Sequence, residues 1–382
     1  MANTDLHQER QKLGPVQHLK IAAPTLPQAH GKLGRELRTV ICRVAKQRLR
    51  NTPPAEFDQQ IAIVRDSRRR LEARAASQLT LPVLREGLEE YLKSLDAWAA
   101  GSELTSILRG QMAGGQSVTP QELALWLQDD NAGCQTGMLR LAGGDVLFWH
   151  TEEDTIGLFD RPRLAELSAG GQSWHAFVYP YLLPGPAFGW HAGYFHAVDS
   201  LHLKRPEHGV PTAVAAWLAW RFGSAAYFDL VRICPFIDGC AVNRVERSAE
   251  GVAASVHEIG WLDASLRELP GVRNKLLFQA NCVGRVPSRL SRRESLPAVE
   301  RDRYCARGQR ARTAIAELTA QAQVSPQQIV DLLAAKSGGS YANANADVKA
   351  HCVGLATTDR IELYVQSGAA LPGDVYQPQF HA

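Results

Sequence analysis

The sequence predicts an α+β fold in which a mostly helical N-terminal segment precedes a region rich in strands. Apolar residues recur at intervals of three or four over Leu84, Leu88 and Leu92, which is typical of one face of a helix. After residue 133 the pattern changes to short apolar runs separated by turn signals, which indicate hairpins. The 382 residues are 45% hydrophobic and 21% charged. This composition favours a globular protein of one large domain or two, and excludes collagen, coiled coil and wholesale disorder.

Residues 1–30 are polar, contain three prolines and lack sustained periodicity. We therefore expect a flexible N-terminal lead over 1–30. Residues 31–133 are predicted to form the helical segment, with two helices between Glu56 and Trp98.

A further helix is predicted to begin at Pro120 and to end near Asp129. Thr119 suits the N-cap, proline suits the first helical turn, and Glu122 occupies the capping-box position. This helix would close the N-terminal segment just before the strands begin.

The strand-rich region opens with a predicted hairpin. Two apolar runs between Met138 and Trp149 flank the turn Ala142–Asp145, whose two glycines tolerate positive φ angles. Residues 133–136 are expected to open its first strand. The remaining predicted elements are a buried helix, two strands around a turn, a capped helix and a last strand, at Ala213–Trp220, Gly239–Val245, Gly251–Ile259, Ser325–Gln328 and Ile361–Val365.

Charge and hydropathy limit the partners. Lys and Arg number 42 against 39 Asp and Glu, a net charge of +3, which is too small for the basic field of a nucleic-acid binder. No signal-peptide stretch begins the chain and no run of 18 apolar residues occurs, so we expect a cytoplasmic protein without a membrane partner. Seven cysteines without a C-x-x-C pair favour free thiols over disulfides.

Several motifs with a known chemistry are absent. The chain has no G-x-S-x-G elbow, no G-x-G-x-x-G fingerprint, no P-loop and no H-E-x-x-H helix. The histidines concentrated between residues 175 and 208 do not follow a helical metal-ligand spacing. We therefore expect neither a cofactor nor a metal site.

One cysteine is a candidate nucleophile because of its position. Cys134 follows the polar loop 129–133, where a capped helix ends, and opens the first strand of the hairpin. This position predicts an exposed thiol, which is the condition for reactivity. The alternative is a buried cysteine that only packs, as most cysteines do.

Gly133-Cys134 is followed by a series of short motifs. They are Glu152, Gly189–Gly193, Gly209–Pro211, Ser255–Glu258, Gln279–Cys282, Arg307 and the closing stretch that begins at His351. Their order resembles the acyl-coenzyme A:6-aminopenicillanic acid acyltransferase family, self-processing N-terminal nucleophile hydrolases that include hydrolases of β-alanyl amines. The resemblance covers about residues 90–378. Gly133-Cys134 is similar to the family's cleavage site, Glu152 falls near its Asn-x-Asp motif, and Gln279–Cys282 is similar to its Thr-Asn-His-Phe motif.

The resemblance implies a four-layer αββα sandwich of the N-terminal nucleophile hydrolase type. It implies self-cleavage between Gly133 and Cys134, so that residues 1–133 become a small chain and residues 134–382 a catalytic large chain. The two chains are expected to remain associated.

The resemblance also implies the roles of the site residues. Cys134 is expected to be the nucleophile, Asn281 the oxyanion donor and Glu152 the acidic catalytic residue, while Arg307, Glu258 and Trp190 are expected to bind substrate. A free α-amino group has a pKa of about 7.7 to 8.0, so the new N-terminus can accept the thiol proton. The expected reaction passes through a thioester and either hydrolyses an amide or transfers an acyl group to an amine, with small-molecule substrates.

This chain departs from the family pattern at three positions. Cys134-Gln135 replaces Cys-Thr, His150-Thr151-Glu152 replaces Asn-x-Asp, and Asn281-Cys282 replaces Asn-His. A penicillin is therefore not the expected substrate. The acidic residue is left open among Glu152, Glu153 and Asp154.

Two other functions fit the sequence. The chain could keep the fold but remain uncleaved, as a catalytically altered binding or partner subunit. A papain-like Cys-His hydrolase is the other alternative, and it requires a partner such as His257 or His351.

Overall fold

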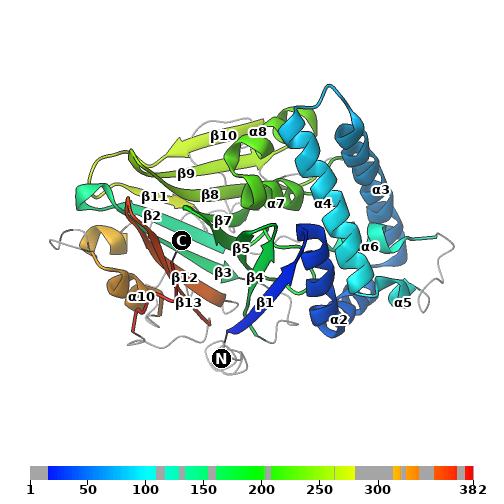
Figure 1. Cartoon of the computed structure of the whole chain (residues 1–382), viewed down its shortest axis with the longest axis horizontal. Coiled ribbons are helices and arrows are strands. Elements are labelled where there is room, and N and C mark those ends of the chain that lie inside the picture. Colours follow the sequence, from blue (N-terminus) through cyan, green and yellow to red (C-terminus); the bar gives the residue numbers. More distant parts are fainter. Residues whose placement is uncertain are drawn as a thin grey trace.

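A computed structural model gives the three-dimensional arrangement of the chain (Figure 1). It contains two large β-sheets and several helices, so the predicted α+β class is confirmed. The structure describes residues 16–108, 117–128, 134–153, 161–201, 203, 208–261, 263–279, 313–318, 320, 324–334, 348–367 and 375–381.

The N-terminal part is mainly helical, as expected. Its helices are α2 (Leu26–Asn51), α3 (Pro54–Ala76), α4 (Pro82–Gly101), α5 (Leu104–Leu108) and α6 (Pro120–Leu127). The predicted capping box starts α6: Thr119 Oγ1 accepts from the backbone N–H of Glu122 at 3.1 Å, and the Glu122 carboxylate accepts from the Thr119 N–H at 2.8 Å. Satisfying free N–H groups at a helix start stabilises that start.

The expected flexible lead is wrong from residue 17 onward. Strand β1 (Gln17–Ala23) pairs in parallel with β4 (Arg163–Ala169), and α2 follows directly. Only Leu19 of β1 is buried. Backbone hydrogen bonds to β4 hold this edge strand in place, so its side chains do not need an alternating apolar pattern. Residues 1–15 lie outside the described residues.

The first sheet has eight strands in the order β1-β4-β5-β6-β7-β8-β9-β10. Its strands after β4 are β5 (Gln172–Phe177), β6 (Phe188–His191), β7 (Tyr194–Leu201), β8 (Gly239–Ser248), β9 (Gly251–Gly260) and β10 (Asp263–Glu268). The predicted pair of strands around residue 250 is confirmed as the β8–β9 hairpin.

The second sheet has six strands in the order β11-β2-β3-β12-β13-β14. They are β2 (Cys134–Arg140), β3 (Val146–Glu153), β11 (Leu276–Gln279), β12 (Val348–Ala356), β13 (Ile361–Ser367) and β14 (Phe380–His381). The predicted β2–β3 hairpin is confirmed, and Gly143 and Gly144 adopt φ angles of 86° and 96° in its turn. Non-glycine residues rarely adopt such angles.

The helices and sheets lie in layers (Figure 1), and three apolar cores lie between or under them. The first packs α2, α4, α7 (Thr212–Phe222) and α8 (Ser224–Ile233) on the outer face of the eight-stranded sheet. The second lies between the two sheets, and the third lies under α10 (Pro326–Ala334), on the outer face of the six-stranded sheet. No helix within the described ranges has the length and apolarity needed to span a bilayer.

Alternation along β3 determines which side chains enter the space between the sheets. Val146 and Phe148 belong to the core between the sheets, whereas Leu147 and Trp149 belong to the core under α10. Successive side chains of a strand point to opposite faces. The next residues of the first set, His150 and Glu152, therefore face the eight-stranded sheet.

Candidate active site

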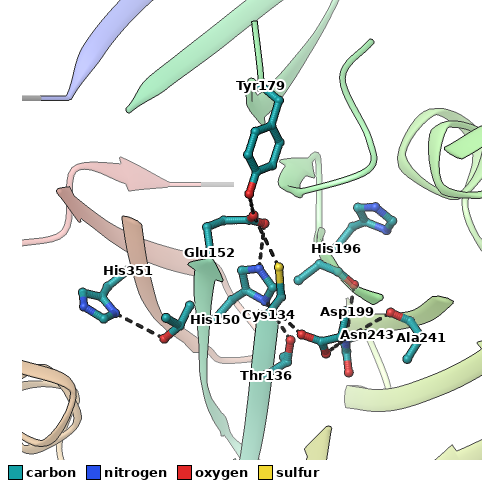
Figure 2. Close-up of polar contacts among 12 residues, drawn as sticks. Cys134, Thr136, His150, Glu152, Tyr179, His196, Asp199, Ala241, Asn243 and His351 are labelled. Atoms are coloured by element: carbon teal, nitrogen blue, oxygen red, sulfur yellow. Dashed lines mark hydrogen bonds and ion pairs between the residues drawn. The ribbon is translucent and has the colours of Figure 1, made fainter. Parts of the chain in front are cut away.

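Cys134 is the first residue of β2 and lies directly opposite Glu152 of β3. Two residues further along β2, Thr136 lies opposite His150. Directly opposed residues of an antiparallel pair share a face, so these four polar side chains form one cluster on the inner face of the six-stranded sheet (Figure 2). All four are buried, at one end of an otherwise apolar layer.

The Cys134 thiol contacts the carboxylate of Glu152. Its Sγ lies 3.5 Å from Oε2 of Glu152, within hydrogen-bond distance for a sulfur donor. Only 3% of Cys134 is exposed, so the expectation of an exposed thiol is wrong. The reason is the strand geometry: Cys134 opens β2 with its side chain on the inner face, in the space between the sheets.

Glu152 is held by two donors besides the thiol. His150 Nε2 lies 2.8 Å from Oε1, and the Tyr179 hydroxyl donates to Oε2. Thr136 Oγ1 lies 2.7 Å from the other ring nitrogen of His150. Both ring nitrogens of His150 are therefore engaged, Nε2 by the Glu152 carboxylate and Nδ1 by the Thr136 hydroxyl. Among the open acidic candidates, the structure brings Glu152 to the thiol.

The eight-stranded sheet contributes Asp199 from β7 and Asn243 from β8 (Figure 2). Asn243 Nδ2 donates to Oδ2 of Asp199 at 2.7 Å, and the other oxygen, Oδ1, lies 3.9 Å from His150 Nδ1. Burial raises the pKa of Asp199 to about 7 and outweighs the opposite effect of His150. A buried carboxyl that is half protonated near neutral pH therefore faces the His150 ring.

The sequence analysis did not identify Asp199 or Asn243 as site residues. A signal for Asp199 exists in β7, where it occupies the same face as Phe195, Ala197 and Leu201. A carboxylate in register with three apolar core positions is unusual, because an unpartnered buried charge is costly.

Cys134, His150 and Asp199 are candidate metal ligands, since each offers a ligand atom within 4.8 Å of the others. However, both ring nitrogens of His150 already have hydrogen-bond partners in Thr136 and Glu152. A metal ion bound to His150 would have to displace either the Thr136 hydroxyl or the Glu152 carboxylate. The geometry therefore favours a hydrogen-bonded site.

Glu258 lies in a neighbouring polar cluster. Its carboxylate accepts from the Ser265 hydroxyl at 3.0 Å and pairs with Arg267 at 3.2 Å. Arg267 also donates to Gln279, which is opposite Thr136 in the β11–β2 pair. Glu258 is therefore connected to the Cys134 cluster through Arg267 and through Gln279 of β11. Its role in substrate binding stays a prediction.

Trp190 lies in the core between the sheets. Its ring stacks on His175 with centroids 4.9 Å apart and packs against Phe380 at 4.7 Å. Only 1% of its surface is exposed. These contacts are those of a core aromatic, and its role in substrate binding is untested.

The histidines required by the papain-like alternative lie on other faces. His351 contacts the Thr151 hydroxyl at 3.2 Å, and Figure 2 shows its ring apart from Cys134. His257 packs against Tyr227 and Phe228 of α8, on the helix side of the eight-stranded sheet. Neither position is that of a thiol partner, so this alternative is contradicted for both residues.

Other predicted site residues fall outside the described residues: Gly133, Asp154, Asn281 and Arg307. A depression of about 500 Å³ on the surface of α2 and α4, lined by residues such as Gln28, Lys32 and Arg35, shares no residue with the Cys134 cluster.

No protein-family model matches the chain. No curated protein matches it either. Function is therefore inferred from the geometry of the site and from the order of the motifs.

Proposed function

We propose that this protein is a self-processing cysteine N-terminal nucleophile enzyme that cleaves or forms an amide bond through an S-acyl intermediate. The main supporting observation is the position of Cys134 at the start of a strand, with its thiol 3.5 Å from the carboxylate of Glu152. A nucleophile, a proton acceptor and fixed donors are the groups that acyl transfer needs.

The layer order supports the αββα sandwich that the resemblance implies. Helices cover the outer face of one sheet, two sheets pack on each other, and α10 covers the second sheet. Cys134 is the first residue of β2, and its side chain lies on the inner face of the six-stranded sheet. A cut just before Cys134 would therefore leave its α-amino group beside its own thiol.

In the mature enzyme, this α-amino group would accept the thiol proton while sulfur attacks the substrate carbonyl. The tetrahedral oxyanion requires a donor, and Asn281 remains the candidate from the motif order. Strand β11 runs antiparallel to β2, so it advances toward the Cys134 end of β2, which supports this candidate. The carbon–nitrogen bond then breaks, and the leaving amine takes up the proton. Water or a second amine releases the acyl group.

The pairing of β1 with β4 supports the expected association of the two chains. β1 belongs to the N-terminal segment, whereas β4 follows Cys134 in the chain. The helices α2 and α4 also bury apolar residues against the eight-stranded sheet. A cut after residue 133 would therefore leave both parts joined by a shared sheet and a shared core.

The intact mass of the purified protein tests the proposal. We expect two species, residues 1–133 and 134–382, and a single full-length species for Cys134→Ala. Cys240→Ala is the matched control because Cys240 is also buried but lies in the core on the helix side. Amide hydrolysis is then assayed with a panel of N-acyl amines. An uncleaved wild type without amidase activity would support the binding-subunit alternative instead.

A further inference from the structure

We propose that Glu152 is the base of the self-cleavage step in the intact chain, and that His150 and Tyr179 are positioning residues that aim its carboxylate at the Cys134 thiol. This inference rests on the proposed function and concerns the reaction that would precede it.

Self-cleavage needs a different base from the mature reaction. Before the cut, the nitrogen of Cys134 belongs to a peptide bond, and its lone pair is delocalised into the carbonyl. It cannot accept the thiol proton. Another group must do so, and Oε2 of Glu152 lies 3.5 Å from Sγ, on the directly opposed residue of the neighbouring strand.

The surroundings of Glu152 fix the direction of its carboxylate. His150 Nε2 lies 2.8 Å from Oε1, while the Tyr179 hydroxyl donates to Oε2, the oxygen that faces the thiol. His150 is itself held by Thr136 at 2.7 Å. Because every member of this chain of contacts is buried, few other rotamers are open to the carboxylate. The arrangement pre-organises proton acceptance at one oxygen.

The proposed step balances as follows. The Cys134 proton passes to Oε2 of Glu152 while the sulfur forms a bond to the carbonyl carbon of Gly133. The bond between this carbon and the nitrogen of Cys134 then breaks, and the protonated Glu152 returns the proton to that nitrogen. The product is a thioester with a free α-amine. Water then hydrolyses the thioester to a carboxylic acid and regenerates the thiol.

After the cut, the α-amine can serve as the base. Glu152 is therefore needed to accept the thiol proton only during self-cleavage. Its carboxylate then lies beside the α-amine and can stabilise the ammonium form that this amine takes after it accepts the thiol proton. The same pair of opposed strand residues would thus perform maturation first and position the mature N-terminus afterwards.

The test follows cleavage of newly translated full-length chain by intact mass over time. We expect Glu152→Gln to slow cleavage by about 10²- to 10⁴-fold, the usual effect of losing a general base. Tyr179→Phe and His150→Ala should each slow it by about tenfold, the effect of one hydrogen bond. His150→Asn keeps a side-chain donor and should recover part of the loss.

Matched controls separate a base from a structural defect. Glu166→Gln removes a carboxylate of β4 that pairs with Lys20, and Tyr227→Phe removes a hydroxyl buried on the helix side. Both should cleave like the wild type. The pH profile gives a second readout, because the rate of Glu152→Gln should rise about tenfold per pH unit below the thiol pKa, as the thiolate must then form without a base.

Two outcomes overturn the inference in distinguishable ways. A wild type that cleaves and a Glu152→Gln variant that cleaves at the same rate and with the same pH profile would reject Glu152 as the base and leave the proposed function intact. A wild type that never cleaves would reject both. Equal slowing by the controls would show that the effect comes from damaged packing, and would also reject the assignment.

Discussion

The carboxyl of Asp199 should make the protein less stable as the pH rises, and Asp199→Asn should remove this effect. Asp199 is fully buried between the sheets, and burial raises its pKa from 3.8 to about 7. Asparagine has nearly the same shape, and its oxygen can still accept from Asn243 Nδ2, which donates to Asp199 at 2.7 Å. The substitution therefore removes the charge with little change in packing.

The sign and size follow from proton linkage. With a folded pKa above the unfolded one, the folded protein binds more protons, so this stabilising contribution is complete below the unfolded pKa and is lost as the pH rises through about 7. Relative to the protonated group, the loss is about 2 kcal/mol at pH 5 and about 4 kcal/mol at pH 8. The free energy of unfolding of Asp199→Asn should therefore gain about 2 to 3 kcal/mol on the parent between pH 5 and pH 8.

Urea unfolding at several pH values measures this difference. Both proteins should carry Cys134→Ala, so that self-cleavage does not mix species. Asp359→Asn is the control, since Asp359 is exposed in a turn and its charge remains hydrated. If Asp199→Asn and its parent show parallel pH dependence, the carboxyl is not desolvated as the structure indicates, and the geometry assigned to the site is wrong.

Three further predictions concern residues that affect the stability of the fold. His30 is buried, and desolvation lowers its pKa to about 3, so the folded protein loses stability as the pH falls below about 6.5. In urea unfolding at pH 5, His30→Leu should therefore recover about 2 kcal/mol of the free energy of unfolding. An unchanged dependence of stability on acid pH would count against burial of the ring. In Gly137→Ala the new Cβ would lie 2.0 Å from the Trp149 ring, so we expect a loss of about 1 to 3 kcal/mol and a lower Tm; an unchanged Tm would contradict this packing. Thr119→Ala should cost about 1 kcal/mol by removing the cap on Glu122 N–H, and thermal unfolding that matches the wild type would show that the cap does not stabilise the fold.

Elements whose signals are local could be predicted from the sequence. The capping box of Thr119 and Glu122 and the glycines of the β2–β3 turn each act within four residues, and both were found as expected. Strand β1 was missed because its stability comes from a parallel partner more than a hundred residues away. Parallel pairing requires a distant crossover, so no local pattern marks such a strand.

The same distinction applies to the site. Cys134 and Glu152 lie equally far along the chain from Gly143 in the hairpin turn, so the turn alone puts them opposite each other, and Thr136 opposite His150. The sequence contained this register, and alternation from Val146 and Phe148 indicates the inner face.

The contacts from the other sheet are of a different kind. Tyr179 reaches Glu152, and Asp199 reaches His150, only because one sheet packs on the other at a particular angle. Side-chain packing over both inner faces sets that angle, so periodicity within a single strand cannot predict it. A strand pattern can nevertheless reveal that such contacts must exist. His150 and Glu152 occupy positions that alternation assigns to an apolar core, and buried polar groups without partners are costly. Polar residues on the core face of β3 therefore imply polar neighbours in the facing layer, which are Tyr179 beside Glu152 and Asp199 beside His150.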